Sequence, residues 1–87
     1  MRSTKLIYIH SIKMDRYPLN ESTLSLIKHM EGGGSVPPIK VARLRNGGYL
    51  ILDGRHRVTA SKLLGRKSIK AKFSETQLRN RGEQNAT

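Results

Sequence analysis

One segment of the chain combines residue types that can bind a phosphate group. The motif Asp53-Gly54-Arg55-His56-Arg57 follows an apolar run at residues 49–52 and precedes a helical pattern that ends at Gly65, which predicts a strand, a tight glycine turn and a helix. The first turn of a helix has unpaired backbone N–H groups and the positive end of the helix dipole. Acidic residues are usual there, so two arginines and a histidine oppose the dipole and suggest a function. We predict that the phosphate-binding residues are Gly54, Arg55, His56 and Arg57.

The spacing within this helix assigns its residues to faces. His56, Ala60, Leu63 and Leu64 recur at helical spacing, which predicts that His56 points toward the core. A second face is expected to carry Arg55, Thr59 and Lys62. Two structural interpretations stay open beside the phosphate site. The basic residues could form an ordinary solvated face, and His56 could be a hydrogen-bonded structural histidine.

The whole chain is strongly basic. Its 87 residues include 17 Lys and Arg against six Asp and Glu, which gives a net charge of +11. Such a charge favours polyanionic partners: nucleic acid first, nucleotides second and an acidic protein surface third. The basic residues around the phosphate site predict a nucleic-acid-binding surface made of Arg43, Arg45, Arg55, Lys62, Arg66, Lys67, Lys70 and Lys72.

Composition limits the remaining possibilities. A chain of 87 residues with one Phe and no Trp is expected to form one small domain with an aliphatic core. Cys is absent, which excludes disulfides, thiolate metal sites and a cysteine nucleophile. The apolar stretch near the N-terminus is too short for a signal peptide or a membrane span, so a cytoplasmic protein without a membrane partner is expected. The sequence does not indicate an oligomeric state.

The elements expected around the site alternate between strand and helix. Strands are predicted at residues 5–9, with Ile12 and Met14 as an extension, and at residues 39–45, 49–52 and 69–73, with a hairpin turn at Asn46-Gly47-Gly48. Asn20 is expected to cap a helix over residues 21–30 whose Leu24, Ile27 and Met30 face the core. The fold class is therefore α+β, a small mixed sheet of about four strands with two or three helices, over residues 1–73. Residues 74–87 are expected to form a polar, basic and partly disordered tail, with a helical turn at residues 77–79.

This order of elements resembles the N-terminal domain of ParB-type partition proteins, which shares a fold with sulfiredoxin. The resemblance covers roughly residues 5–73 and is most specific over residues 47–57, continued by Ala60 and by Leu63-Leu64-Gly65. Partition proteins have a Gly-Glu-Arg-Arg box at this turn and sulfiredoxins a Gly-Cys-His-Arg box, where this chain has Gly54-Arg55-His56-Arg57. In those families the box binds the phosphates of CTP or ATP. The resemblance implies that Gly54, His56 and Arg57 contact phosphate and that the cofactor is a nucleoside triphosphate with Mg²⁺.

Position 55 departs from both families. Arg55 stands where sulfiredoxin has its catalytic Cys and where partition proteins have a Glu implicated in metal-assisted hydrolysis. The resemblance therefore implies binding without efficient turnover. We also expect a minimal module, without the helix-turn-helix DNA reader and the dimerisation domain of full partition proteins.

Three function classes follow. The first is a ParB-like phosphate-binding module that acts on DNA or nucleotide without efficient turnover. The second is a metal-dependent ParB-like nuclease, which normally needs two or more carboxylates, whereas the motif contains only Asp53, with Asp15 and Glu31 remote in sequence. Asp53 is expected to cap the turn or to form an ion pair rather than to bind a metal. The third is a basic adaptor or inhibitor that docks on an acidic protein partner.

Overall fold

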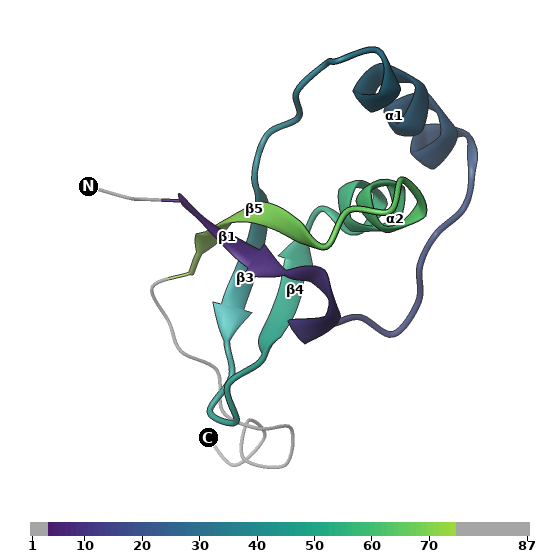
Figure 1. Cartoon of the computed structure of the whole chain (residues 1–87). Helices are drawn as coiled ribbons and strands as arrows, with labels where there is room; N and C mark the ends of the chain where they lie inside the picture. The colour runs from purple at the N-terminus through teal and green to yellow at the C-terminus, as the bar shows by residue number, and fades with distance from the viewer. Residues whose placement is uncertain (1–3, 75–87) are drawn as a thin grey trace.

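The computed structural model describes residues 4–74, which form five strands, two α-helices and one 3₁₀ helix (Figure 1). In chain order these are β1 (Thr4–Tyr8), η1 (Ile9–Ser11), β2 (Ile12–Lys13), α1 (Glu21–Glu31), β3 (Ile39–Arg43), β4 (Tyr49–Asp53), α2 (Arg55–Leu63) and β5 (Ser68–Phe73). The predicted helical turn at residues 77–79 and most of the predicted tail lie outside the described residues.

The strands form one mixed sheet in the order β1-β5-β3-β4-β2. β1 pairs with β5 and β3 with β4 in antiparallel fashion, whereas β3 pairs with β5 and β2 with β4 in parallel. The predicted α+β class with a mixed sheet and two or three helices is confirmed. The predicted strand count of about four becomes five because residues 12 and 13 form a strand of their own.

The predicted extension of the first strand through Ile12 and Met14 is wrong. The 3₁₀ helix turns the chain after Tyr8, and Ile12–Lys13 then pairs with β4 at the opposite edge of the sheet from β1. This turn lets both Ile9 and Ile12 enter the core. Three residues span only about 10 Å, so the two edges must approach each other and the sheet must curl strongly.

The core is aliphatic, as the composition predicts. Its buried cluster consists of Ile7, Ile9, Ile12, Ile39, Val41, Ile51, Val58, Ile69 and Ala71. Tyr49 and Phe73 pack at its margin with their ring centroids 5.7 Å apart. All five strands contribute at least one side chain to this cluster, so the core fixes the strands relative to one another and thereby the end of β4, where the predicted site lies.

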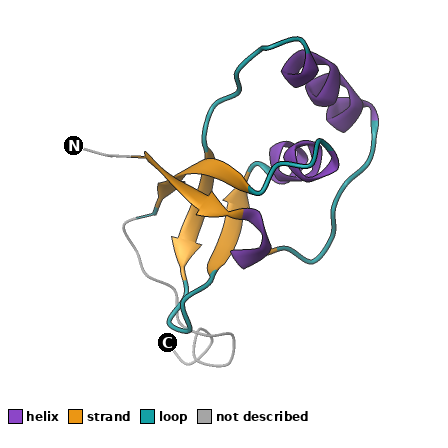
Figure 2. Cartoon of the chain, in the orientation of Figure 1, coloured by secondary structure: helices purple, strands orange, loops and turns teal. Residues whose placement is uncertain are grey.

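The two helices lie on the same side of the sheet, and α2 is nearer to the strands (Figure 2). α2 contacts both α1 and β3. Because α2 has neighbours on two sides, four consecutive residues, Val58 to Ser61, are buried. Burial therefore extends beyond the single stripe that the spacing predicts. Thr59, which the spacing places on a second face with Arg55 and Lys62, is only 4% exposed, and Leu63, which it places on the core face, is 57% exposed.

Helix α1 begins as predicted. Its N-cap is Asn20, whose side-chain oxygen accepts a hydrogen bond from the Thr23 N–H at 3.2 Å. The predicted inward face is partly wrong, since Leu24 is 52% exposed and Thr23 is fully buried. The Thr23 hydroxyl donates to the Pro18 carbonyl at 2.8 Å, which turns this residue toward the preceding connector and Leu24 away from it.

A candidate phosphate-binding site at the start of helix α2

The turn between β4 and α2 requires glycine at position 54. Gly54 has a φ of +112°, in the left-handed region that disfavours residues with a side chain. A Cβ atom at this position would lie 2.6 Å from Cγ2 of Ile39, a side chain that is fully buried in the core. The chain can therefore pass directly from the strand into the helix and bring the helix start against the end of the sheet.

The first turn of α2 presents backbone donors that the helix itself does not use. The Val58 N–H donates to the Gly54 carbonyl at 3.0 Å, so the N–H groups of Arg55, His56 and Arg57 precede the first helical hydrogen bond. No side chain caps this end, and its first turn contains no acidic residue. The predicted capping role of Asp53 is therefore not seen at this helix. Free amides and an uncompensated helix dipole form an environment that favours an anion.

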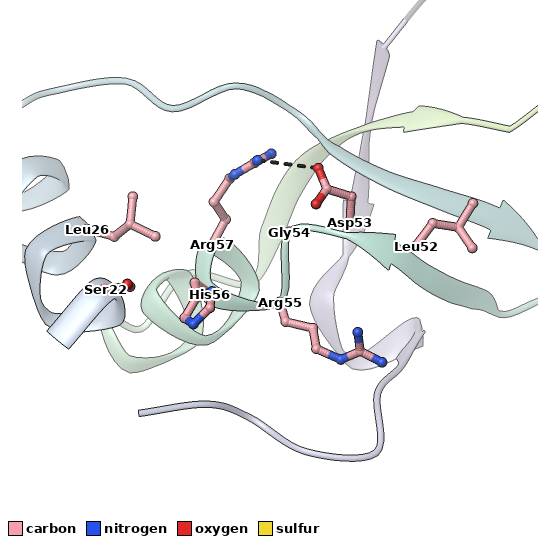
Figure 3. Close-up of a pocket in the computed structure, with 8 residues that line it drawn as sticks. All are labelled: Ser22, Leu26, Leu52, Asp53, Gly54, Arg55, His56 and Arg57. Atoms are coloured by element: carbon pink, nitrogen blue, oxygen red, sulfur yellow. Dashed lines mark ion pairs between the residues drawn. The ribbon is translucent and has the colours of Figure 1, made fainter. Parts of the chain in front are cut away.

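A cavity of about 440 Å³ opens at this helix start. It lies between the beginnings of α1 and α2 and is lined by Ser22, Leu26, Leu52, Asp53, Gly54, Arg55, His56 and Arg57 (Figure 3). All four residues predicted from the sequence to bind phosphate line this one cavity. Its volume lies within the range of small-molecule and nucleotide sites.

Arg55 already has an acidic partner. Its guanidinium lies 3.4 Å from the Asp15 carboxylate on the connector between β2 and α1. The Arg55 side chain is 44% exposed and that of Asp15 75% exposed, so solvent screens this ion pair. A phosphate group that entered the cavity would therefore compete with a weak partner for Arg55.

Arg57 has a different environment from Arg55, and the two side chains leave the start of α2 in different directions (Figure 3). One guanidinium nitrogen of Arg57 donates to the Pro38 carbonyl at 2.8 Å and to the Pro37 carbonyl at 3.3 Å. The other nitrogen lies 3.6 Å from the Asp53 carboxylate, which forms the predicted ion pair. Arg57 therefore holds the loop before β3 against α2 in addition to lining the cavity.

His56 is half-buried, and its Nε2 atom is buried without a hydrogen-bond partner in the described structure. A buried polar atom without a partner costs about 1–3 kcal/mol, so such atoms are rare away from binding sites. The interpretation of His56 as a histidine satisfied by the protein's own hydrogen bonds therefore does not account for this nitrogen.

The basic residues predicted to bind nucleic acid come from several different elements. Lys70 and Lys72 alternate along β5 with the core residues Ile69 and Ala71, so they point away from the core. Arg43 lies over the ring of Phe73, 4.1 Å from its centroid, and Phe73 packs toward the core. The others are distributed over the helix α2 (Arg55, Lys62), the loop that follows it (Arg66, Lys67) and the β3–β4 hairpin (Arg45). Lys62 contacts the Tyr17 ring of the connector at 4.5 Å.

The sequence motif did not include three of the eight residues that line the cavity. Ser22 and Leu26 come from α1 and Leu52 from the end of β4, while Asp15 lies 40 positions before the arginine that it contacts. No local motif connects residues so distant in sequence. The scarcity of acidic residues in this basic chain had indicated Asp15 only as a remote carboxylate for the nuclease interpretation, not as a partner of Arg55.

Two kinds of site, a membrane-spanning helix and a shared metal site, are absent from residues 4–74. Within this range no helix is long and apolar enough to cross a membrane. The same residues include no group of three His, Asp or Glu side chains placed to share a metal ion.

Solved structures similar to this chain share its fold. Sulfiredoxin from Arabidopsis thaliana is 22% identical with a TM-score of 0.74, and the match covers 86% of this chain and 88% of that one. The C-terminally truncated chromosome-partitioning protein ParB from Caulobacter crescentus, complexed with CTP-γ-S, is 21% identical with a TM-score of 0.69. A Pnob8-like ParB-N domain is 24% identical with a TM-score of 0.65. The chain covers 46% of the Caulobacter protein and 30% of the Pnob8-like chain.

At the level of sequence, no curated protein matches this chain. The family description "ParB N-terminal domain" matches residues 3–85, which is nearly the entire sequence. The predicted resemblance to partition proteins and sulfiredoxin is thus confirmed by the family match and by the shared fold. The chain belongs to the ParB N-terminal domain family.

Proposed function

We propose that this domain binds a nucleotide through its phosphate groups at the start of α2, without efficient turnover. The observation that carries the proposal is the uncapped first turn of α2, which opens into a cavity lined by Arg55, His56 and Arg57. The ParB protein of Caulobacter crescentus, which has the same fold, was solved as a complex with CTP-γ-S. This relative supports a nucleotide rather than a free phosphate as the ligand.

The cavity offers different donors to different parts of a phosphate chain. Backbone N–H groups at residues 55–57 favour an oxygen placed on the helix axis. Arg55 can turn from the exposed carboxylate of Asp15 to a phosphate, because charge-assisted hydrogen bonds to phosphate are stronger than a screened surface pair. His56 also lines the cavity, and a turn of its ring would bring the buried Nε2 atom to a phosphate oxygen. The apolar side chains Leu26 and Leu52 provide surface for the rest of the nucleotide.

The absence of efficient turnover follows in this proposal from the charges around the cavity. Asp53 is the one carboxylate among the eight lining residues, and it is paired with Arg57. Asp15 is paired with Arg55. Mg²⁺ would arrive bound to the nucleotide, and Asp53 is the lining residue that would contact it. One carboxylate next to two arginines is a poor arrangement for activating an attacking water. No specific observation favours the nuclease or the adaptor class over this proposal.

The test is a thermal-shift titration of the protein with ATP, CTP, GTP, UTP and inorganic phosphate, each with and without Mg²⁺. A ligand that binds only the folded state raises the apparent melting temperature as its concentration exceeds Kd. We expect at least one nucleotide to raise the melting temperature more than inorganic phosphate does. Release of phosphate from the nucleotide, measured in the same samples, should remain at background.

Two variants locate the site. His56→Phe keeps a ring of similar size and removes both nitrogens, so the unliganded protein should be as stable as the parent or more so, while the nucleotide-induced shift falls. Arg55→Gln removes an exposed cation and should weaken the shift with little effect on the unliganded protein. If both variants respond to nucleotide as the parent does, the nucleotide binds elsewhere and the proposal is wrong.

A further inference from the structure

A second surface, centred on the strands β1 and β5, which do not neighbour β4 in the sheet, combines exposed apolar, aromatic and basic side chains. In β1 and β5 the core residues Ile7, Ile69 and Ala71 alternate with residues that point to the opposite face of the sheet. These outward residues, with their neighbour on β3, are Thr4, Leu6, Tyr8, Ser68, Lys70, Lys72 and Lys40, which we call the outer face.

The register places these outward side chains in adjacent pairs. Leu6 lies opposite Lys70, and Lys72 has Thr4 on one side and Lys40 on the other. Directly paired residues on one face of a sheet have Cβ atoms about 4.5–5.5 Å apart. Lys40 and Lys72 are therefore direct neighbours, and Lys70 lies about 7 Å further along β5, next to the apolar side chain of Leu6.

The exposed side chains of β1 are unusual for a solvated strand. Leu6 is 66% exposed and Tyr8 is 63% exposed. Tyr8 stacks on His10 of η1, with ring centroids 5.4 Å apart and an angle of 19° between the ring planes. Two nearly parallel rings on an exposed strand and turn offer a flat platform, which the local sequence pattern did not indicate.

The charge of this surface is mostly positive, and its nearest acidic residue in the sheet is Asp53 of β4, which lies opposite Lys40 and is paired with Arg57. The strands β1, β3 and β5 contain no acidic residue, and no acidic residue occurs among residues 4–14. Lys70 and Lys72 therefore have no acidic partner in the sheet, whereas Lys40 has Asp53 as its partner on β4. A polyanion with flat apolar groups matches both the lysines and the Tyr8–His10 stack.

We propose that the outer face binds single-stranded nucleic acid, with a base stacked on the Tyr8–His10 pair and phosphates along Lys70, Lys72 and Lys40. Aromatic rings beside a basic surface are the usual means of binding single strands without sequence preference. In a duplex the faces of the bases are occupied by their neighbours, so a duplex contacts the lysines alone and binds more weakly. This surface goes beyond the proposed function, because it shares no residue with the α2 cavity.

The test is fluorescence anisotropy with a labelled oligo-thymidine, an oligo-uridine and a labelled duplex of the same length. We expect both single strands to bind more tightly than the duplex. Tyr8→Ala should weaken single-strand binding by at least about fivefold, because a stacked base contributes about 1 kcal/mol or more. Tyr8→Phe keeps the ring and should bind as the parent does. Tyr17→Ala is the matched control, since Tyr17 is 40% exposed and lies on the connector before α1.

The charge contribution is tested by the double variant Lys70→Gln with Lys72→Gln. It should reduce the slope of log Kd against log salt by about 0.7 for each phosphate contact that is lost. Lys28→Gln, on the exposed side of α1, removes a charge elsewhere and should leave the slope close to that of the parent.

Three outcomes would overturn the proposal. They are a duplex that binds as tightly as the single strands, a Tyr8→Ala variant that binds as the parent does, and poly-glutamate that displaces the oligonucleotide as well as unlabelled oligonucleotide does. The last outcome would point to an acidic polypeptide as the partner. His56→Phe should leave single-strand binding unchanged and Tyr8→Ala should leave the nucleotide-induced thermal shift unchanged, so a failure of either proposal can be recognised independently.

Discussion

The ion pair between Asp15 and Arg55 should act as an internal competitor of the phosphate ligand. Asp15→Asn removes the carboxylate that lies 3.4 Å from the Arg55 guanidinium and keeps the size of the side chain. Exposed pairs of this kind contribute about 0.2–1 kcal/mol. If phosphate must displace Asp15, removal of that pair should tighten nucleotide binding by about 1.4- to 5-fold.

Isothermal titration calorimetry of parent and variant measures this change directly. Glu31→Gln is the control, because it raises the net charge of the chain by the same amount at the far end of α1. Asp15→Asn should tighten binding more than Glu31→Gln does, and the difference should shrink as salt is added. If the two variants bind equally, or if Asp15→Asn binds more weakly than the parent, Arg55 does not exchange Asp15 for phosphate and the reasoning is refuted.

Three further predictions concern the framework of the site and are measured by urea denaturation. Gly54→Ala should lower the free energy of unfolding by about 2–4 kcal/mol, because a Cβ adds both positive-φ strain and a collision with buried Ile39. Gly65→Ala is the control, because Gly65 also has a positive φ but has open space around it, and it should lower the free energy of unfolding by only about 1 kcal/mol. Equal losses in the two variants would show that the collision with Ile39 does not contribute. Arg57→Ala should cost about 1.5–3 kcal/mol through the lost hydrogen bonds to Pro37 and Pro38, and an unchanged stability would show that these bonds contribute nothing. Asn20→Ala should cost about 1 kcal/mol, whereas Asn20→Asp should retain most of the stability.

The local elements could be predicted from the sequence because their determinants are local. Asn20 caps α1 as expected, and Gly65, with a φ of +82°, ends α2. The hairpin turn also forms where predicted, with the Asn46 side chain accepting from the Gly48 N–H at 3.1 Å. Each of these features depends on hydrogen bonds within a few residues, so residue type and spacing were sufficient.

Features that depend on contacts between elements could not be predicted in the same way. The spacing of α2 predicts a single buried stripe, whereas contact with both α1 and β3 buries Thr59 as well. β2 separates from β1 only because residues 12 and 13 find a partner in β4 across the curled sheet. In the cavity, the four residues of the motif could be named, but their roles differ because Pro37, Pro38 and Asp15 contact the two arginines from remote positions.

The central claim is that a nucleotide phosphate binds at the first turn of α2. The most direct measurement is a titration of the ¹⁵N-labelled protein with the nucleotide that gives the largest thermal shift, followed by amide NMR. We expect the amide signals of Gly54, Arg55, His56 and Arg57 to shift first and furthest, because their N–H groups would donate to the phosphate or lie next to it. Shifts confined to β1 and β5, with the amides of residues 54–57 unchanged at saturation, would contradict the claim.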